Sequence, residues 1–155
     1  MRPSASGRPT PLRGRAAAFC LVALVCLAGC APAVARVPAG PSGTRTVTVP
    51  ADGDRTATVH HAASAGAGAP LVVVLHGARG TAADMRANLG WDALADREGL
   101  VVAYPDGLDR TWNAGRCCGP ARDRGVDDVG FLDTLVTTLR RTDAVGPVYA
   151  VGFSN

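Results

Sequence analysis

The C-terminal residues of the chain constrain its fold most strongly, because they combine a short apolar strand with a sharp turn. Residues 147–151 (Pro-Val-Tyr-Ala-Val) are apolar and rich in β-branched and aromatic side chains, which is typical of a buried parallel strand. Gly152 follows the strand directly, and Ser154 stands two positions later. A glycine at that position lets neighbouring backbone approach closely. We therefore predict that Ser154 lies at the apex of a sharp turn after a buried strand.

A serine on such a turn has the position of a catalytic nucleophile. A hydroxyl is a weak nucleophile, so it must be held out where a histidine can take its proton. The pattern Gly-x-Ser-x-Gly is the nucleophile elbow, and this chain supplies its first four positions. The backbone N–H of Asn155 would then donate to the oxyanion of a tetrahedral intermediate. An ordinary polar turn is the alternative, since a short motif can match by chance.

A second donor to the oxyanion is predicted upstream. Residues 71–75 (Leu-Val-Val-Val-Leu) form a continuous apolar run, as expected of a central parallel strand buried on both faces. His76 and Gly77 follow it. Sites built on a nucleophile elbow place at this position the loop that gives the oxyanion its second N–H donor. This position predicts the backbone N–H of Ala78 as that donor. His76 itself is predicted to be structural. In proteins with this elbow the serine comes first in the sequence, then the acid and then the catalytic histidine, whereas His76 precedes Ser154.

The other segments alternate between strand and helix patterns. Residues 44–49 and 55–61 alternate polar and apolar side chains around a turn, which predicts a β-hairpin. Its last residues, His60 and His61, are expected at a solvated strand end. Residues 81–99 predict a helix that is interrupted at Gly90, and residues 100–104 predict another buried strand. This order predicts an α/β fold with a mixed, mostly parallel sheet and flanking helices.

A further helix is predicted to begin at Asp127 and Asp128. Its apolar stripe follows at helical spacing over residues 132–139, and two arginines lie in its last turn. Acidic residues at the start of a helix and basic residues at its end complement the helix dipole. Capping therefore explains both aspartates, and neither is predicted as a triad acid.

The long segment between these elements, residues 108–126, has no periodicity and contains unusual residues. Trp112 either lines a substrate cleft or covers the core. Cys117 and Cys118 predict a disulfide in an exported protein, either with each other or with a partner beyond Asn155. Two neighbouring thiols without further ligands do not form a zinc pattern, so no metal site is predicted.

The N-terminal residues have the pattern of an export signal. Residues 1–15 are basic, residues 16–25 are apolar, and residues 27–30 (Leu-Ala-Gly-Cys) resemble the lipobox of bacterial lipoproteins. We predict a signal peptide over residues 1–30, acylation of Cys30 and thus membrane anchoring in the cell envelope, or secretion. Plain cleavage near residues 31–35 and an uncleaved anchor are the alternatives.

Composition after this leader describes an ordinary globular domain. Residues 31–43 are rich in Pro, Ala and Gly and predict a flexible tether, and residues 44–155 hold a partial domain. The formal charge of +3 comes from the leader, since residues 1–29 contain four arginines and no acid. The rest of the chain holds 12 arginines against 13 acids, so the charge gives no indication of nucleic-acid binding.

Several motifs in order identify a family resemblance over residues 70–155. They are His76-Gly77, residues 104–107 (Tyr-Pro-Asp-Gly), residues 112–119, residues 127–131 and residues 152–155. This order resembles the polyhydroxybutyrate depolymerase and feruloyl esterase family of secreted α/β-hydrolases, which includes bacterial lipoproteins. The resemblance implies a Ser-Asp-His carboxylesterase, without a cofactor, acting on polyesters or on plant cell-wall phenolic and acetyl esters. By position, Ser154 would be the nucleophile, and Ala78 and Asn155 the oxyanion donors.

The resemblance covers the first half of such a fold. The sequence reaches the elbow but not the triad acid, the triad histidine or the later strands, so we expect an N-terminal half that is inactive alone and exposes an apolar sheet edge. One alternative is a non-catalytic envelope lipoprotein that uses part of the scaffold for binding. Another is a peptidase or thioesterase on the same fold, because a fold does not fix the substrate.

Overall fold

The computed structural model describes residues 40–117 and 119–155. The predicted signal peptide, the acylation of Cys30 and most of the tether fall in residues 1–39, outside the described residues, as does Cys118. No helix in the two described ranges has the length and apolar character needed to cross a membrane.

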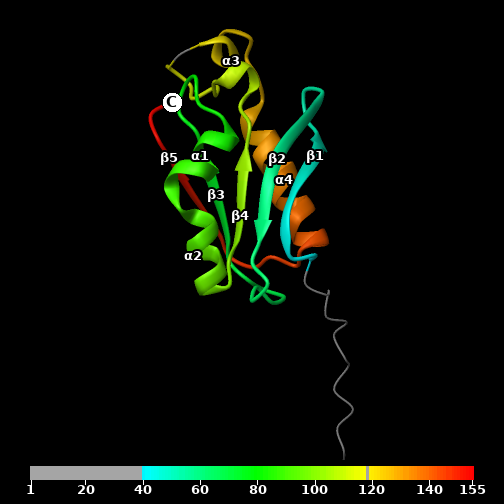
Figure 1. The fold of residues 1–155 in the computed structure, drawn as a ribbon. Helices are drawn as coiled ribbons and strands as arrows, with labels where there is room; N and C mark the ends of the chain where they lie inside the picture. The colour runs from blue at the N-terminus through cyan, green and yellow to red at the C-terminus, as the bar shows by residue number, and fades with distance from the viewer. Residues whose placement is uncertain (1–39, 118) are drawn as a thin grey trace, which may run out of the picture. The chain divides into compact units, whose positions relative to one another are not determined.

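Five strands form one mixed sheet in the order β1-β2-β4-β3-β5 (Figure 1). The strand β2 pairs antiparallel with both β1 and β4. The strand β3 pairs in parallel with both β4 and β5. The predicted hairpin and the three later strands are confirmed. The strands are β1 (Gly43–Pro50), β2 (Asp54–His61), β3 (Leu71–Leu75), β4 (Val101–Pro105) and β5 (Val148–Gly152).

Helices cover both faces of the sheet. The helices α1 (Ala82–Leu89) and α2 (Trp91–Glu98) lie on one face, and α4 (Asp128–Thr142) lies on the other (Figure 1). The Thr81 side chain caps α1 by accepting from the Asp84 N–H, and Gly90 takes a left-handed conformation between α1 and α2. The helix predicted over residues 81–99 with a break at Gly90 is therefore confirmed.

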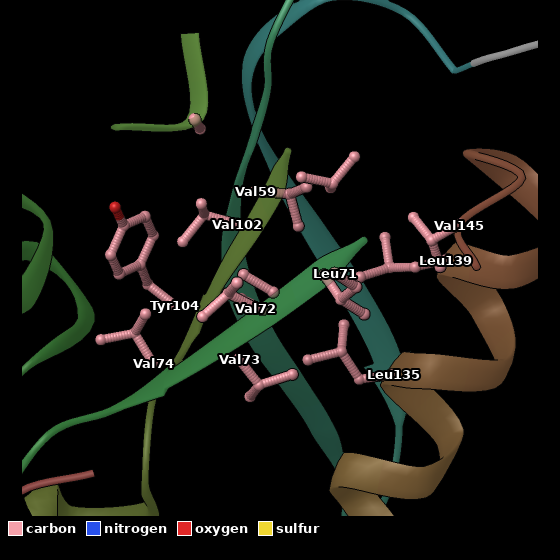
Figure 2. Packing of buried hydrophobic residues seen from close by; sticks show 14 of the residues in the cluster. Val59, Leu71, Val72, Val73, Val74, Val102, Tyr104, Leu135, Leu139 and Val145 are labelled. Carbon is pink, nitrogen blue, oxygen red and sulfur yellow. The ribbon is translucent and has the colours of Figure 1, made fainter. Parts of the chain in front are cut away.

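The core lies on both sides of β3, as the continuous apolar run predicted. Leu71 points toward Leu135 and Leu139 of α4, while Val72 and Val74 lie on the side of Tyr104 (Figure 2). The Tyr104 ring is buried, and its hydroxyl donates to Asp92 of α2 over 2.7 Å. Burial, and then the hydrogen bond and charge of Asp92, raise the pKa of Tyr104. The phenol therefore stays neutral and can serve as a permanent donor.

Two details differ from the sequence predictions. The segment over residues 108–126 includes two short helices, η1 (Leu108–Arg110) and α3 (Pro120–Asp123), rather than irregular chain throughout. The end of β2 is not solvated on either face of the strand. His61 is 1% exposed, and the His60 ring lies 2.8 Å from a carboxylate oxygen of Asp96 on α2.

The strand β5 is an edge of the described sheet, and much of it is uncovered. Tyr149 is 58% exposed and Phe153, just after the strand, is 73% exposed. A groove of about 380 Å³ runs between α4, β3 and β5. Its apolar lining comes from Val73, Leu75, Val129, Leu132, Val136, Val148 and Ala150. The described residues thus present the apolar edge and face that the sequence predicted.

We expect residues 40–155 on their own to self-associate through this surface, because it combines unpaired backbone groups with apolar side chains. Tyr149→Lys should weaken that association on the order of tenfold, since an edge lysine resists strand pairing and costs energy to bury. Sedimentation velocity over a range of concentrations measures the effect. Leu89→Lys, at an exposed leucine of α1, is the matched control. Association weakened equally by both substitutions would contradict a role for the β5 edge.

Candidate active site

The turn after β5 has the geometry expected of a strained elbow. Ser154 has a φ of 59° and an exposed side chain. A positive φ is unfavourable for a residue with a side chain, so surrounding contacts must hold it. Gly77 lies directly against this turn. A Cβ at Gly77 would stand 2.8 Å from the carbonyl oxygen of Phe153 and 3.3 Å from the Cβ of Ser154. The His-Gly loop can therefore pack on the elbow only because it has glycine there.

Two backbone donors are available beside the serine. No hydrogen bond within residues 40–117 and 119–155 uses the backbone N–H of Ala78 or of Asn155. Ala78 is exposed, and it follows the glycine that contacts the elbow. Unpaired N–H groups next to a serine hydroxyl are the chemical requirement of an oxyanion hole. The assignment of Ala78 and Asn155 as its donors stays a prediction.

The side chain of Asn155 joins the elbow to the long segment that precedes α4. Its amide oxygen accepts from the Trp112 N–H at 3.2 Å, and its amide nitrogen donates to the Trp112 carbonyl at 3.0 Å. The same nitrogen donates to the Cys117 carbonyl at 3.4 Å. The sequence pattern predicts a role only for the backbone of Asn155. The side-chain contacts were not foreseeable, since they join residues far apart in the sequence.

Trp112 is 6% exposed and belongs to the core. Its indole N–H donates to the His76 carbonyl at 2.8 Å, which ties the segment to the end of β3. Of the two roles left open for Trp112, the structure shows core packing, and lining of a substrate cleft stays a prediction. His76 is structural, as predicted. Its Nε2 accepts from the Gly107 N–H at 2.9 Å, so its Nδ1 carries the proton that it donates to the Gly77 carbonyl at 2.8 Å.

The described residues do not assemble a catalytic triad. The chain has three histidines, and all of them lie in the part of the chain that the structure describes. His60 contacts Asp96, His61 bonds to the Ala62 carbonyl, and His76 bonds to Gly77 and Gly107. None of them hydrogen-bonds to Ser154. The described residues thus hold Ser154 on a strained turn, and none of their histidines hydrogen-bonds to it.

A buried ion pair joins β2 to the start of α4. Arg55 of β2 lies 2.7 Å from a carboxylate oxygen of Asp128, and the two side chains are 3% and 6% exposed. The guanidinium carbon is 3.9 Å from the Phe131 ring centroid and 5.8 Å from that of Trp112. The other Asp128 oxygen accepts from the Asn113 N–H at 2.6 Å. These contacts hold the long segment at Asn113 against β2 and α4.

This pair corrects one sequence interpretation. Asp127 does cap α4, by accepting from the Gly130 N–H at 2.9 Å. Asp128 was also expected to cap the helix, but its carboxylate turns inward to Arg55 and Asn113. Buried charges are stable only when they are paired, so each of these residues requires the other. Arg55 was not predicted as buried, although its position in phase with Ala57 and Val59 is a signal for the buried face of β2.

Cys117 is disulfide-bonded, as predicted for an exported protein, and its partner lies outside the described residues. The pairing with Cys118 stays a prediction. In the described part of the chain, no cluster of three or more His, Cys, Asp or Glu side chains is arranged to hold a metal ion.

Comparisons with known proteins show which sequences this chain resembles. No protein-family model matches the chain. A putative esterase, NocK, from Nocardia uniformis subsp. tsuyamanensis is 38% identical over 89 residues, which are 56% of this chain and 26% of NocK. Feruloyl esterase B from Piromyces equi is 32% identical over 92 residues, or 56% of this chain and 16% of that enzyme. The chain thus spans about a quarter of the length of NocK and about a sixth of that of the feruloyl esterase.

A solved structure supports the fold directly. The poly(3-hydroxybutyrate) depolymerase LpqC from Bordetella parapertussis matches 72% of this chain and 43% of its own, with a TM-score of 0.57 and 22% sequence identity. The predicted resemblance to the polyhydroxybutyrate depolymerase and feruloyl esterase type of hydrolase is confirmed. The described domain is a partial α/β-hydrolase fold, with its mixed sheet and flanking helices.

We expect Arg55→Met to lower the free energy of unfolding by about 3–5 kcal/mol, because Asp128 would remain buried without its partner. Arg55→Met combined with Asp128→Asn should recover part of this loss, since asparagine is neutral and still accepts from Asn113. Urea denaturation measures the free energy of unfolding of both variants and of the wild-type protein. Arg97→Met, at an exposed arginine of α2, is the control and should change stability by no more than about 0.5 kcal/mol. A double variant as unstable as Arg55→Met would contradict the buried-charge explanation.

Proposed function

We propose that the complete protein, this chain with any polypeptide encoded after Asn155, is a serine esterase. The observation that carries this proposal is the strained Ser154 turn, packed against Gly77 and flanked by two unpaired backbone N–H groups. Ester hydrolysis needs this combination, because a nucleophile must approach a carbonyl whose oxygen becomes negatively charged. The named esterases among the relatives support the same reaction class.

The reaction proceeds in two halves. The Ser154 hydroxyl attacks the ester carbonyl while a histidine takes its proton, and the Ala78 and Asn155 N–H groups bind the resulting oxyanion. Collapse of the intermediate expels the alcohol, which leaves with the proton from the histidine, and the acyl group stays on Ser154. Water then attacks the acyl-enzyme by the same route and releases the acid. The triad acid and histidine are proposed to come from polypeptide beyond Asn155, so residues 1–155 alone are proposed to be inactive.

The substrate class is proposed from the relatives. LpqC is named a poly(3-hydroxybutyrate) depolymerase and the Piromyces protein a feruloyl esterase. We accordingly propose polyesters or plant cell-wall phenolic and acetyl esters as substrates. Plant cell-wall esters lie outside the cell that degrades them, which fits the proposed export through the leader and anchoring at Cys30. Membrane fractionation before and after Cys30→Ser tests that anchor, and unchanged partitioning would refute it.

A non-catalytic binding role is the second candidate. The observation that favours it is that none of the three histidines reaches Ser154. An envelope lipoprotein with this scaffold would keep the fold and bind esters without hydrolysing them.

We expect Ser154→Ala in the complete protein to lower kcat for a short p-nitrophenyl ester by roughly 10⁴-fold or more, because the acyl-enzyme cannot form. Release of p-nitrophenol, followed by absorbance, measures this. Ser64→Ala is the matched control, since the Ser64 hydroxyl only donates to the Asp96 carbonyl. An active Ser154→Ala variant would refute the nucleophile, and an inactive wild-type protein that still binds esters would favour the non-catalytic role.

We expect Asn155→Ala to lower kcat by roughly 10-fold to 100-fold with little change in KM. Alanine keeps the backbone N–H but loses the three side-chain hydrogen bonds that hold it in position. Steady-state kinetics on the same ester separate kcat from KM. Asn88→Ala, at an exposed asparagine of α1 whose amide donates to the Asp84 carbonyl, serves as the control. An unchanged kcat would mean that the side chain does not position the oxyanion donor.

A further inference from the structure

Backbone strain is concentrated around one cavity at the edge of the candidate site. Six described residues other than glycine have a positive φ, and four of them lie at this edge: Arg79, Asp109, Arg110 and Ser154. Glycine would adopt such a conformation without penalty, whereas residues with side chains adopt it at a cost. Strain of this kind persists where surrounding contacts enforce it, and it clusters at functional sites. The Ser154 strain belongs to the elbow, and the other three residues require a separate explanation.

Arg79 and Asp109 line a cavity of about 330 Å³ together with Ala78, Thr111, Gly119 and Pro120. Ala78 is the proposed oxyanion donor, so the cavity adjoins the position of the reacting carbonyl. The backbone of Arg79 is fixed on both sides. Its N–H donates to the Arg110 carbonyl at 2.8 Å, and the Gly80 N–H donates to the Gly77 carbonyl at 2.9 Å.

The charges at this cavity do not balance. Asp109 is already paired with Arg124. The Thr111 hydroxyl is also engaged, since it donates to the Leu108 carbonyl and accepts from the Ala121 N–H. The Arg79 side chain, by contrast, makes no ion pair or hydrogen bond within the described ranges 40–117 and 119–155. The cavity therefore offers one exposed, uncompensated guanidinium beside largely apolar walls.

We propose that this cavity is a subsite for a carboxylate, and that Arg79 is the residue that binds it. The inference rests on the proposed esterase function and narrows its substrates to esters that carry a carboxylate a few bonds from the scissile carbonyl. A guanidinium matches a carboxylate with two parallel hydrogen bonds. Adjacent Cα atoms are about 3.8 Å apart, so a carbonyl at the Ala78 N–H lies within reach of the Arg79 side chain. The Arg79 guanidinium fits a monoanion, and Asp109, which lines the same cavity, disfavours a dianion such as phosphate.

The test compares matched esters in the complete protein. Mono-p-nitrophenyl glutarate and p-nitrophenyl valerate have acyl chains of equal length, and only the former carries a terminal carboxylate. Acetoxybenzoate and phenyl acetate form a second pair, in which the carboxylate is on the alcohol side. At low ionic strength we expect the wild-type protein to prefer the anionic member of at least one pair by roughly tenfold or more in kcat/KM, as a charge-assisted contact predicts.

Arg79→Gln should remove that preference and leave kcat/KM for the neutral ester within about twofold, since only the charged contact is lost. Arg79→Lys should retain part of it, and Arg97→Gln on α2 should retain all of it. The preference should also fall in about 0.5 M salt. Turnover of both members without preference, or an equal loss on both in Arg79→Gln, would overturn the carboxylate subsite alone. Failure of the wild-type protein to hydrolyse any of the four esters would overturn the esterase function and this inference with it.

Discussion

The candidate site depends on the parallel pairing of β3 with β5. The register pairs Leu71 with Val148 and Leu75 with Gly152, so the two strands end level with one another. The residues that follow each strand then meet at one edge of the sheet, and Gly77 contacts the Phe153 carbonyl and Ser154. A register shift of one residue would separate these loops and reverse the faces of β5. The Asn155 side-chain contacts with Trp112, which follow β5, depend on the same register.

Successive contacts stabilise the strained turn from the side of the long segment. The Asn155 amide holds the Trp112 backbone, the Trp112 indole holds the end of β3, and the Arg55 ion pair holds Asn113 and the start of α4. Each contact is modest, since a net hydrogen bond contributes about 0.5–1.5 kcal/mol. Together they connect β2, β3, α4 and the elbow. A residue such as Ser154 can keep a positive φ only when several independent contacts oppose its relaxation.

Local patterns predicted the elements, and the motifs predicted the nucleophile. The alternation of β1 and β2, the apolar run of β3 and the cap at Thr81 each depend on neighbours in sequence, which explains why those predictions were confirmed. The Arg55 pair and the Asn155 side-chain contacts join residues that are distant in sequence, and no spacing rule reveals them. His61 was placed wrongly although it alternates in phase with the buried Ala57 and Val59, on the face of β2 opposite to His60 and α2. The strain at Arg79 and Asp109 likewise appears only in the backbone conformation.

The contacts also separate two requirements of ester hydrolysis. Stabilisation of an oxyanion needs donors whose positions are fixed before the reaction, because reorganising them would add to the barrier. Among the described residues, the Asn155 side-chain hydrogen bonds and the packing of Gly77 hold the turn that carries the proposed donors, and neither involves a histidine side chain. Proton transfer needs a base within hydrogen-bonding distance of the serine, which a different part of a fold can provide. The strained turn can therefore form independently of the proposed general base. This explains why a domain without an assembled triad can still carry a strained elbow of well-defined geometry.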